Sequence, residues 1–327
     1  MAGFLTRRAA LIGAGGLVGL GALAACAPKS PSGDLAGVTL RTATYRGNPE
    51  SYFKQAGVAD TPYQLTRSQF ASGNLISEAI NARALDVGGM SEIPPIFVAQ
   101  APGNLVRIVA VLKGDVNNQV VLVPKGSAIK SIGDLKGKRV GYVRATTSHY
   151  ILLKILQEAG LGWGDIVPSA LTPQDGLAAF QRGSLDAWVI YGVVVQQAIR
   201  GGATVLTTAL GRLSGNYLVA ASSEALADPQ KKKAIGDYLQ RYRSVLAWIN
   251  ADDARWAATR AADTGIPAEL YLDEARRRSA RPELVAVSDA AIASQQGVAD
   301  TFAKAGVIPK PVAVAPIWDR GLQSYLS

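Results

Sequence analysis

The feature that most constrains the fold of this chain is an alternation of two hydrophobic patterns. From residue 38 onward, short apolar runs typical of strands alternate with segments of helical periodicity. The strand-like runs are residues 38–43, 63–66, 86–89, 105–112, 119–124, 139–143, 186–190, 203–207 and 216–221. The helical segments between them include residues 72–84, 149–159 and 174–182. This alternation predicts an α/β protein whose sheets are mostly parallel and flanked by helices.

The strand-like runs fall into two series, and the chain beyond Pro229 is almost wholly helical. Two series with a helical tail predict two lobes, between which the chain crosses near residues 119–122 and 216–220. We expect residues 37–119 plus 219–327 to form the first lobe and residues 120–218 the second. One long helix is predicted over residues 231–250. Its apolar residues at helical spacing are Ile235, Leu239, Tyr242, Leu246 and Ile249.

The N-terminus has the pattern of an export signal. Arg7 and Arg8 precede an uncharged stretch over residues 9–25, which is short for a stable membrane span. The stretch ends in Leu-Ala-Ala followed by Cys26, which resembles a bacterial lipobox. We therefore expect residues 1–25 to be a lipoprotein signal peptide, Cys26 to be acylated, and residues 26–36 to be a tether. The paired arginines leave Sec and twin-arginine export both open.

Charge and composition exclude several other functions. The formal net charge is +9, from 34 Lys+Arg against 25 Asp+Glu, but the basic residues are scattered. No zinc-finger spacing or aromatic-basic RNA motif occurs, so no nucleic-acid partner is expected. The chain has one Cys and one His, which allows neither an intrachain disulfide nor a structural zinc site. No metal or cofactor is expected.

Candidate binding residues follow the predicted strands, because open α/β sheets bind ligands at the carboxyl ends of their strands. The strongest such loop contains Arg144, Thr146, Thr147 and Ser148 and precedes a predicted helix. One hydroxyl is expected to cap that helix. The other hydroxyls, the free N–H groups of the first turn and Arg144 would form an anion site. The remaining strand ends contribute Tyr45, Arg46, Ser91, Glu92, Tyr191 and Asn216.

Several motifs resemble the substrate-binding proteins of ABC importers. The resemblance is to the aliphatic sulfonate, taurine and nitrate group, which is related to the thiamine-precursor proteins. The similar segments span residues 38–315 and are 88–97 (GGMSEIPPIF), 121–127 (VLVPKGS), 132–140 (IGDLKGKRV), 178–188 (AAFQRGSLDAW), 294–296 (SQQ) and 306–312 (GVIPKPV). This resemblance implies a type II periplasmic binding protein fold with the ligand between two lobes. It also implies an ABC permease and its ATPase as partners, and a monomer on the outer side of the membrane.

By position, the resemblance implies sulfonate contacts from residues 146–148 and cavity walls from Tyr45, Ser91, Glu92 and Tyr191. One departure stands out, because the family commonly reads Trp-Asp-Pro where this chain has Tyr191, Gly192 and Val193. Loss of that carboxylate predicts a preference for plain organic anions over zwitterions. Two alternatives remain open at this point: an enzyme on the same fold, and a ligand sensor for a signalling partner.

Overall fold

The structure is a computed structural model that describes residues 34–327, and it contains two β-sheets. The predicted signal peptide, Cys26 and most of the tether lie outside the described residues. The first sheet has the order β11-β4-β10-β3-β1-β2. Its strands are β1 (Thr39–Thr44), β2 (Gln64–Gln69), β3 (Val87–Ser91), β4 (Val106–Lys113), β10 (Asn216–Ser222) and β11 (Glu283–Val285). The second has the order β7-β6-β8-β5-β9, with β5 (Val120–Val123), β6 (Arg139–Tyr142), β7 (Val167–Ala170), β8 (Ala187–Ile190) and β9 (Thr204–Thr208).

Both sheets are mixed, which corrects the expectation of mostly parallel pairing. In the first sheet β1 pairs in parallel with β2 and β3, whereas β10 is antiparallel to both of its neighbours and β11 to β4. In the second, β6 is parallel to β7 and β8, whereas β5 is antiparallel to β8 and β9. The exceptions include β5 and β10, the first strands that the chain forms after each passage between the sheets. They run against their neighbours because they enter each sheet from the opposite end.

The two segments that pass between the sheets lie side by side. One runs from β4 to β5 and the other from β9 to β10. The backbone N–H of Gly114 donates to the carbonyl of Gly215 at 3.0 Å, and the N–H of Ala209 donates to the carbonyl of Gln119 at 2.8 Å. We call these paired segments the hinge, and the two sheets with their helices the first and second lobes.

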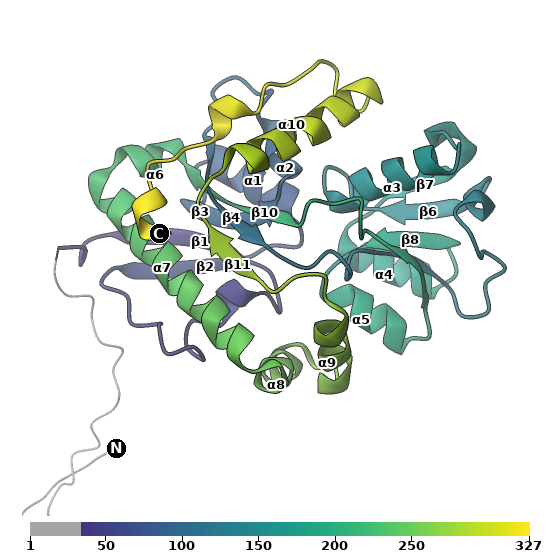
Figure 1. The fold of residues 1–327 in the computed structure, drawn as a ribbon, viewed down its shortest axis with the longest axis horizontal. Coiled ribbons are helices and arrows are strands. Elements are labelled where there is room, and N and C mark those ends of the chain that lie inside the picture. Colours follow the sequence, from purple (N-terminus) through teal and green to yellow (C-terminus); the bar gives the residue numbers. More distant parts are fainter. Residues whose placement is uncertain (1–33) are drawn as a thin grey trace, which may run out of the picture. The chain divides into compact units, whose positions relative to one another are not determined.

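Helices cover both faces of each sheet (Figure 1). No helix within residues 34–327 is both long enough and apolar enough to cross a membrane. The α-helices are α1 (Gly73–Asn81), α2 (Pro94–Val98), α3 (Thr147–Glu158), α4 (Pro173–Gln181), α5 (Val193–Arg200), α6 (Ser223–Ala227), α7 (Pro229–Ala251), α8 (Asp253–Thr264), α9 (Ala268–Arg277) and α10 (Asp289–Lys304).

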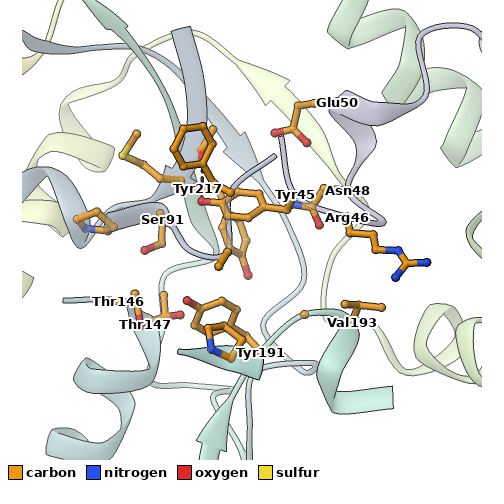
Figure 2. Close-up of a pocket in the computed structure, with 18 of the residues that line it drawn as sticks. Tyr45, Arg46, Asn48, Glu50, Ser91, Thr146, Thr147, Tyr191, Val193 and Tyr217 are labelled. Atoms are coloured by element: carbon orange, nitrogen blue, oxygen red, sulfur yellow. Dashed lines mark hydrogen bonds between the residues drawn. The ribbon is translucent and has the colours of Figure 1, made fainter. Parts of the chain in front are cut away.

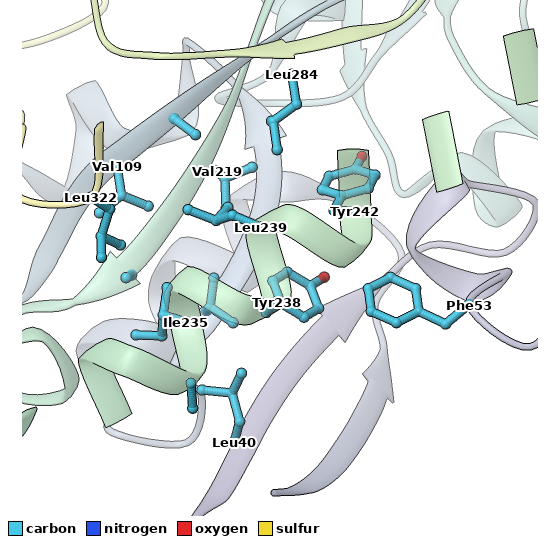
Figure 3. Packing of buried hydrophobic residues seen from close by; sticks show 14 of the residues in the cluster. Leu40, Phe53, Val109, Val219, Ile235, Tyr238, Leu239, Tyr242, Leu284 and Leu322 are labelled. Carbon is cyan, nitrogen blue, oxygen red and sulfur yellow. The ribbon is translucent and has the colours of Figure 1, made fainter. Parts of the chain in front are cut away.

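Helix α7 supplies much of the core of the first lobe. Pro229 occupies its first turn, and the Asp228 carboxylate caps it by accepting the N–H groups of Gln230 and Lys231. The predicted apolar face is confirmed, since all five of its members are buried. Figure 3 shows this face among buried strand residues of the same cluster, with Leu239 beside Val219 and Ile235 towards Leu40.

Two strands were not predicted. Strand β7 contains Pro168, which cannot donate a ladder hydrogen bond and therefore weakens the strand signal. The structure accommodates it because β7 is at the edge of its sheet. Strand β11 has only three residues within a mainly helical region.

The lobes also touch beyond the hinge. Tyr150 of α3 lies edge-on to Phe302 of α10, with ring centroids 5.6 Å apart. The Gln196 amide of α5 donates to the Glu274 carboxylate of α9 at 3.0 Å. These contacts enclose the space between the sheets.

Candidate functional site

A cavity of about 460 Å³ lies between the lobes and is lined from both. The first residues of five helices line it, so the N-termini of α1 to α5 converge on one space. These residues are Gly73, Pro94, Thr147, Pro173 and Val193. Helix N-termini carry partial positive charge and unpaired N–H groups, so their convergence favours an anion.

The start of α3 holds the best set of donors. Its intrahelical hydrogen bonds begin with the N–H groups of His149 and Tyr150, which both donate to the Thr146 carbonyl. The N–H groups of Thr147 and Ser148 therefore have no partner within the helix. Thr146 and Thr147 line the cavity, and Figure 2 shows both on the side that Tyr191 also occupies.

The hydroxyls of residues 146–148 have different roles. Thr146 Oγ1 donates to the Val143 carbonyl at 2.8 Å. Ser148 Oγ donates to the Val189 carbonyl at 2.5 Å and accepts the Val143 N–H at 3.0 Å. These bonds tie α3 to β8 and to the end of β6, and they engage the proton of the Ser148 hydroxyl and one of its lone pairs. Thr147 Oγ1 has no protein hydrogen-bond partner within residues 34–327, so it remains available to a ligand.

Gly192, the position of the family departure, is the N-cap residue that precedes α5. Gly192 has φ 77° and ψ −158°, a conformation open essentially only to glycine. A Cβ there would meet open space, so the departure leaves room in the cavity. The neighbouring Tyr191 hydroxyl is buried without a hydrogen-bond partner among the described residues. Burial raises the pKa of Tyr191 to about 12, so this hydroxyl stays protonated near neutral pH.

The first lobe supplies an aromatic wall joined to the hinge. Tyr45 Oη donates to the Gly89 carbonyl at 3.1 Å. Gln119 Nε2 donates to Tyr217 Oη at 2.7 Å, and Tyr217 Oη donates to the Asp115 carbonyl at 2.6 Å. The side-chain amide oxygen of Gln119, Oε1, is buried and unpartnered among the described residues. The wall therefore offers the cavity a free acceptor from the hinge.

One carboxylate and one guanidinium line the cavity. Arg46 is exposed and donates to the Asp263 backbone carbonyl at 2.7 Å, and Figure 2 shows its side chain directed away from the labelled hydroxyls. Glu50 is only 4% exposed, and its Oε2 has no partner within residues 34–327. Burial raises the pKa of Glu50, which its own backbone N–H and the nearby Tyr242 hydroxyl partly offset.

The structure brings together six of the ten predicted binding residues. Those that line the cavity are Tyr45, Arg46, Ser91, Thr146, Thr147 and Tyr191. The other four are not among the lining residues. They are Glu92, Arg144, Ser148 and Asn216.

Glu92 and Asn216 belong to a buried polar network beside the cavity. Glu92 accepts from Ser214 Oγ at 2.6 Å and from Ser294 Oγ at 3.0 Å. Asn216 accepts from Lys113 Nζ. Both residues neighbour a lining residue in sequence, but successive side chains of a strand point to opposite faces, so Tyr217 and not Asn216 reaches the cavity. Arg144 is exposed in the turn before α3.

Seven polar lining residues are not among the ten predicted ones: Asn48, Glu50, Gln69, Gln119, Gln174, Tyr217 and Tyr242. Tyr217 follows the candidate Asn216 directly and could have been found by considering both faces of the strand. Glu50 and Tyr242 are far apart in sequence and meet only because α7 packs beside residues 49–51.

These features define the class of two-lobed, periplasmic-type solute-binding proteins. Residues 41–236 match the model of the NMT1/THI5-like family. The chain is 35% identical to an aliphatic sulfonates-binding protein of Escherichia coli (strain K12) over 76% of this chain and 78% of that protein. It also resembles two solved structures. The alkanesulfonate-binding protein SsuA from Xanthomonas axonopodis pv. citri bound to MOPS has a TM-score of 0.80 at 27% identity and covers 86% of this chain and 98% of its own.

The second structure is the periplasmic aliphatic sulphonate binding protein SsuA from Escherichia coli, with a TM-score of 0.73 at 28% identity and coverage of 85% and 96%. The chain therefore belongs to the NMT1/THI5-like family, together with the aliphatic sulfonates-binding proteins. The resemblance and the two-lobed α/β fold inferred from the sequence are confirmed. All three relatives are named as binding proteins and none as an enzyme, which supports the expectation that this chain is not an enzyme.

Proposed function

We propose that this protein captures a small organic sulfonate outside the cytoplasm and delivers it to an ABC import permease. The observation that carries the proposal is the set of uncharged donors at the cavity. The free N–H groups at the start of α3, the Thr147 hydroxyl and the Tyr191 hydroxyl converge there, and the one lining guanidinium is engaged elsewhere.

Uncharged donors suit a sulfonate for a physical reason. A sulfonic acid is a strong acid, so its anion, the sulfonate, stays ionised at any physiological pH and needs hydrogen-bond donors and no proton-accepting partner. Backbone N–H groups at a helix N-terminus provide such donors together with a favourable dipole. The names of the relatives, which bind aliphatic sulfonates or alkanesulfonates, support the same ligand class.

The proposal includes export and anchoring. Cys26 would be acylated, would become the mature N-terminus and would hold the two-lobed domain at the membrane surface as a monomer. The lipobox-like pattern before Cys26 supports this step. The permease and its ATPase would then receive the ligand from the closed lobes.

Thermal unfolding of the purified protein in the presence of small anions tests the proposal. The panel contains alkanesulfonates, arylsulfonates, sulfate, nitrate and carboxylates of matched size. A true ligand at about 100 times its dissociation constant is expected to stabilise the fold by about 2.7 kcal/mol. Stabilisation by carboxylates or nitrate without any response to sulfonates would contradict the proposal.

A further inference from the structure

Two buried polar groups on the first-lobe wall of the cavity have no hydrogen-bond partner. Glu50 Oε2 and the Tyr242 hydroxyl have no partner at hydrogen-bond distance within residues 34–327, and both residues line the cavity. The two groups lie near each other, since the Tyr242 hydroxyl lowers the pKa of Glu50. Tyr242 is 1% exposed, so neither group is compensated by bulk solvent. Native structures rarely leave such groups without a partner, and a ligand or an ordered water is the usual explanation.

Glu50 forms no salt bridge within residues 34–327. Glu50 helps to raise the pKa values of Tyr45, Tyr238 and Tyr242, so these three hydroxyls are neutral at physiological pH. Arg46 also lines the cavity, but its guanidinium donates to the Asp263 backbone carbonyl and not to Glu50. An ionised Glu50 would therefore be an uncompensated negative charge in the cavity wall, ready for a cation.

The protein is built to hold the Glu50 carboxyl against β3. A Cβ on Gly89 would lie 2.5 Å from Glu50 Oε1, so only glycine at this position lets the carboxyl approach the strand. Figure 2 shows Glu50 on the side of Tyr45, across the cavity from Thr146, Thr147 and Tyr191. The acceptors and the anion-binding donors thus occupy opposite walls.

We propose that the cavity is bipolar and selects a zwitterionic aminosulfonate, whose sulfonate meets the start of α3 and whose ammonium group meets Glu50 and the Tyr242 oxygen. This inference rests on the proposed function and makes it more specific. It also replaces the expectation, drawn from Gly192, that the protein prefers plain organic anions. The carboxylate that is missing from the second lobe has a counterpart in the first.

Calorimetry with matched ligands tests the inference. At each chain length, an ω-amino-alkanesulfonate is compared with the alkanesulfonate that has a methyl group in place of the ammonium, for example 2-aminoethanesulfonate with propane-1-sulfonate. The corresponding hydroxyl compound, 2-hydroxyethanesulfonate, separates charge from simple hydrogen bonding. For the wild type, we expect the amino compound of the best-fitting length to bind at least tenfold more tightly than its methyl counterpart, with the hydroxyl compound between them.

Glu50→Gln keeps the size of the side chain and removes its charge. In this variant, the ratio of the affinity for the amino compound to that for the methyl compound is expected to fall to about one or below, while the methyl compound still binds. Tyr242→Phe provides a second variant and should lower the ratio less. Glu92→Gln is the matched control, because Glu92 is an equally buried glutamate outside the cavity lining, and its ratio should equal that of the wild type.

The outcomes separate the two proposals. If amino and methyl compounds bind equally to the wild type at every length, or if Glu50→Gln keeps the full ratio, the bipolar cavity is wrong and the sulfonate function stands. Equal binding of the hydroxyl and amino compounds also overturns it, since Glu50 would then act without charge. If no sulfonate binds at all, the proposed function fails, and the inference fails with it.

Discussion

The Gln119 side chain donates to the Tyr217 hydroxyl across the two strands of the hinge, at 2.7 Å. Gln119 precedes β5, and Tyr217 is the second residue of β10, so this bond joins the two passages of the chain between the lobes. Both residues also line the cavity, and the same hydroxyl donates to the Asp115 carbonyl. The aromatic wall of the cavity is therefore joined directly to the hinge.

Removal of the hydroxyl in Tyr217→Phe is expected to lower the free energy of unfolding by about 1–3 kcal/mol, because it leaves buried partners unpaired. Urea denaturation followed by circular dichroism measures the loss. Tyr325→Phe is the matched control, since the Tyr325 hydroxyl has no hydrogen-bond partner within the described part of the chain. A loss no larger than that of the control would show that the Gln119–Tyr217–Asp115 chain contributes nothing to stability.

Thr147→Ala is expected to weaken sulfonate binding about tenfold or more, because a hydrogen bond to a charged group contributes about 1.5–3 kcal/mol. Its stability should stay within about 0.5 kcal/mol of wild type, since Thr147 Oγ1 makes no protein hydrogen bond among residues 34–327. Calorimetry and urea denaturation measure the two quantities.

Ser148→Ala should show the opposite pattern to Thr147→Ala, with its main effect on stability and not on sulfonate affinity. It removes a bond to the Val189 carbonyl and one from the Val143 N–H, so about 1–3 kcal/mol of stability should be lost. A similar loss of affinity with unchanged stability in both variants would contradict the separate roles assigned to these neighbours.

Glu50→Gln is expected to stabilise the ligand-free protein at pH 7.5. Burial raises the pKa of Glu50 in the folded state above its ordinary value of 4.5, so the folded state binds this proton more tightly than the unfolded state does. The stability that this group contributes is therefore present at low pH and is lost as the pH rises through the raised pKa. The thermal unfolding temperature of the variant should exceed that of the wild type at pH 7.5, and the difference should shrink towards pH 4. A difference independent of pH would contradict this origin.

Cys26→Ser is expected to release the protein from membranes, because an acyl anchor contributes about 0.8 kcal/mol per buried CH₂. Labelled fatty acid should be incorporated into the wild type in cells and not into the variant. Fractionation that finds both proteins equally in the membrane pellet would remove the case for lipid anchoring.

Much of the fold was predictable because it follows from local patterns. The periodicity of α7 identified a buried face of Ile235, Leu239 and Tyr242 without knowledge of what covers it. The start of α3 was recognisable as a donor site because strand, hydroxyl residues and helix follow one another directly in the sequence. Both predictions depend on fewer than about 25 consecutive residues.

The rest of the site was not predictable because it depends on direction and on distant packing. Whether Asn216 or Tyr217 reaches the cavity depends on the register of β10 against β3 and β4, which a single strand does not reveal. Glu50 is buried by Tyr242, which lies about 190 positions further along the chain. The sequence around Glu50 contains no pattern that predicts a buried carboxylate there.

Gly192 limits how this protein can change its ligand in evolution or in the laboratory. Its φ of 77° means that a single substitution to aspartate would strain the turn before α5, although a Cβ has room there. The family's usual carboxylate therefore cannot return in one step without remodelling that turn. The easier mutational paths to a new specificity run through the first-lobe wall, where exchanges at Glu50 alter charge without altering the backbone.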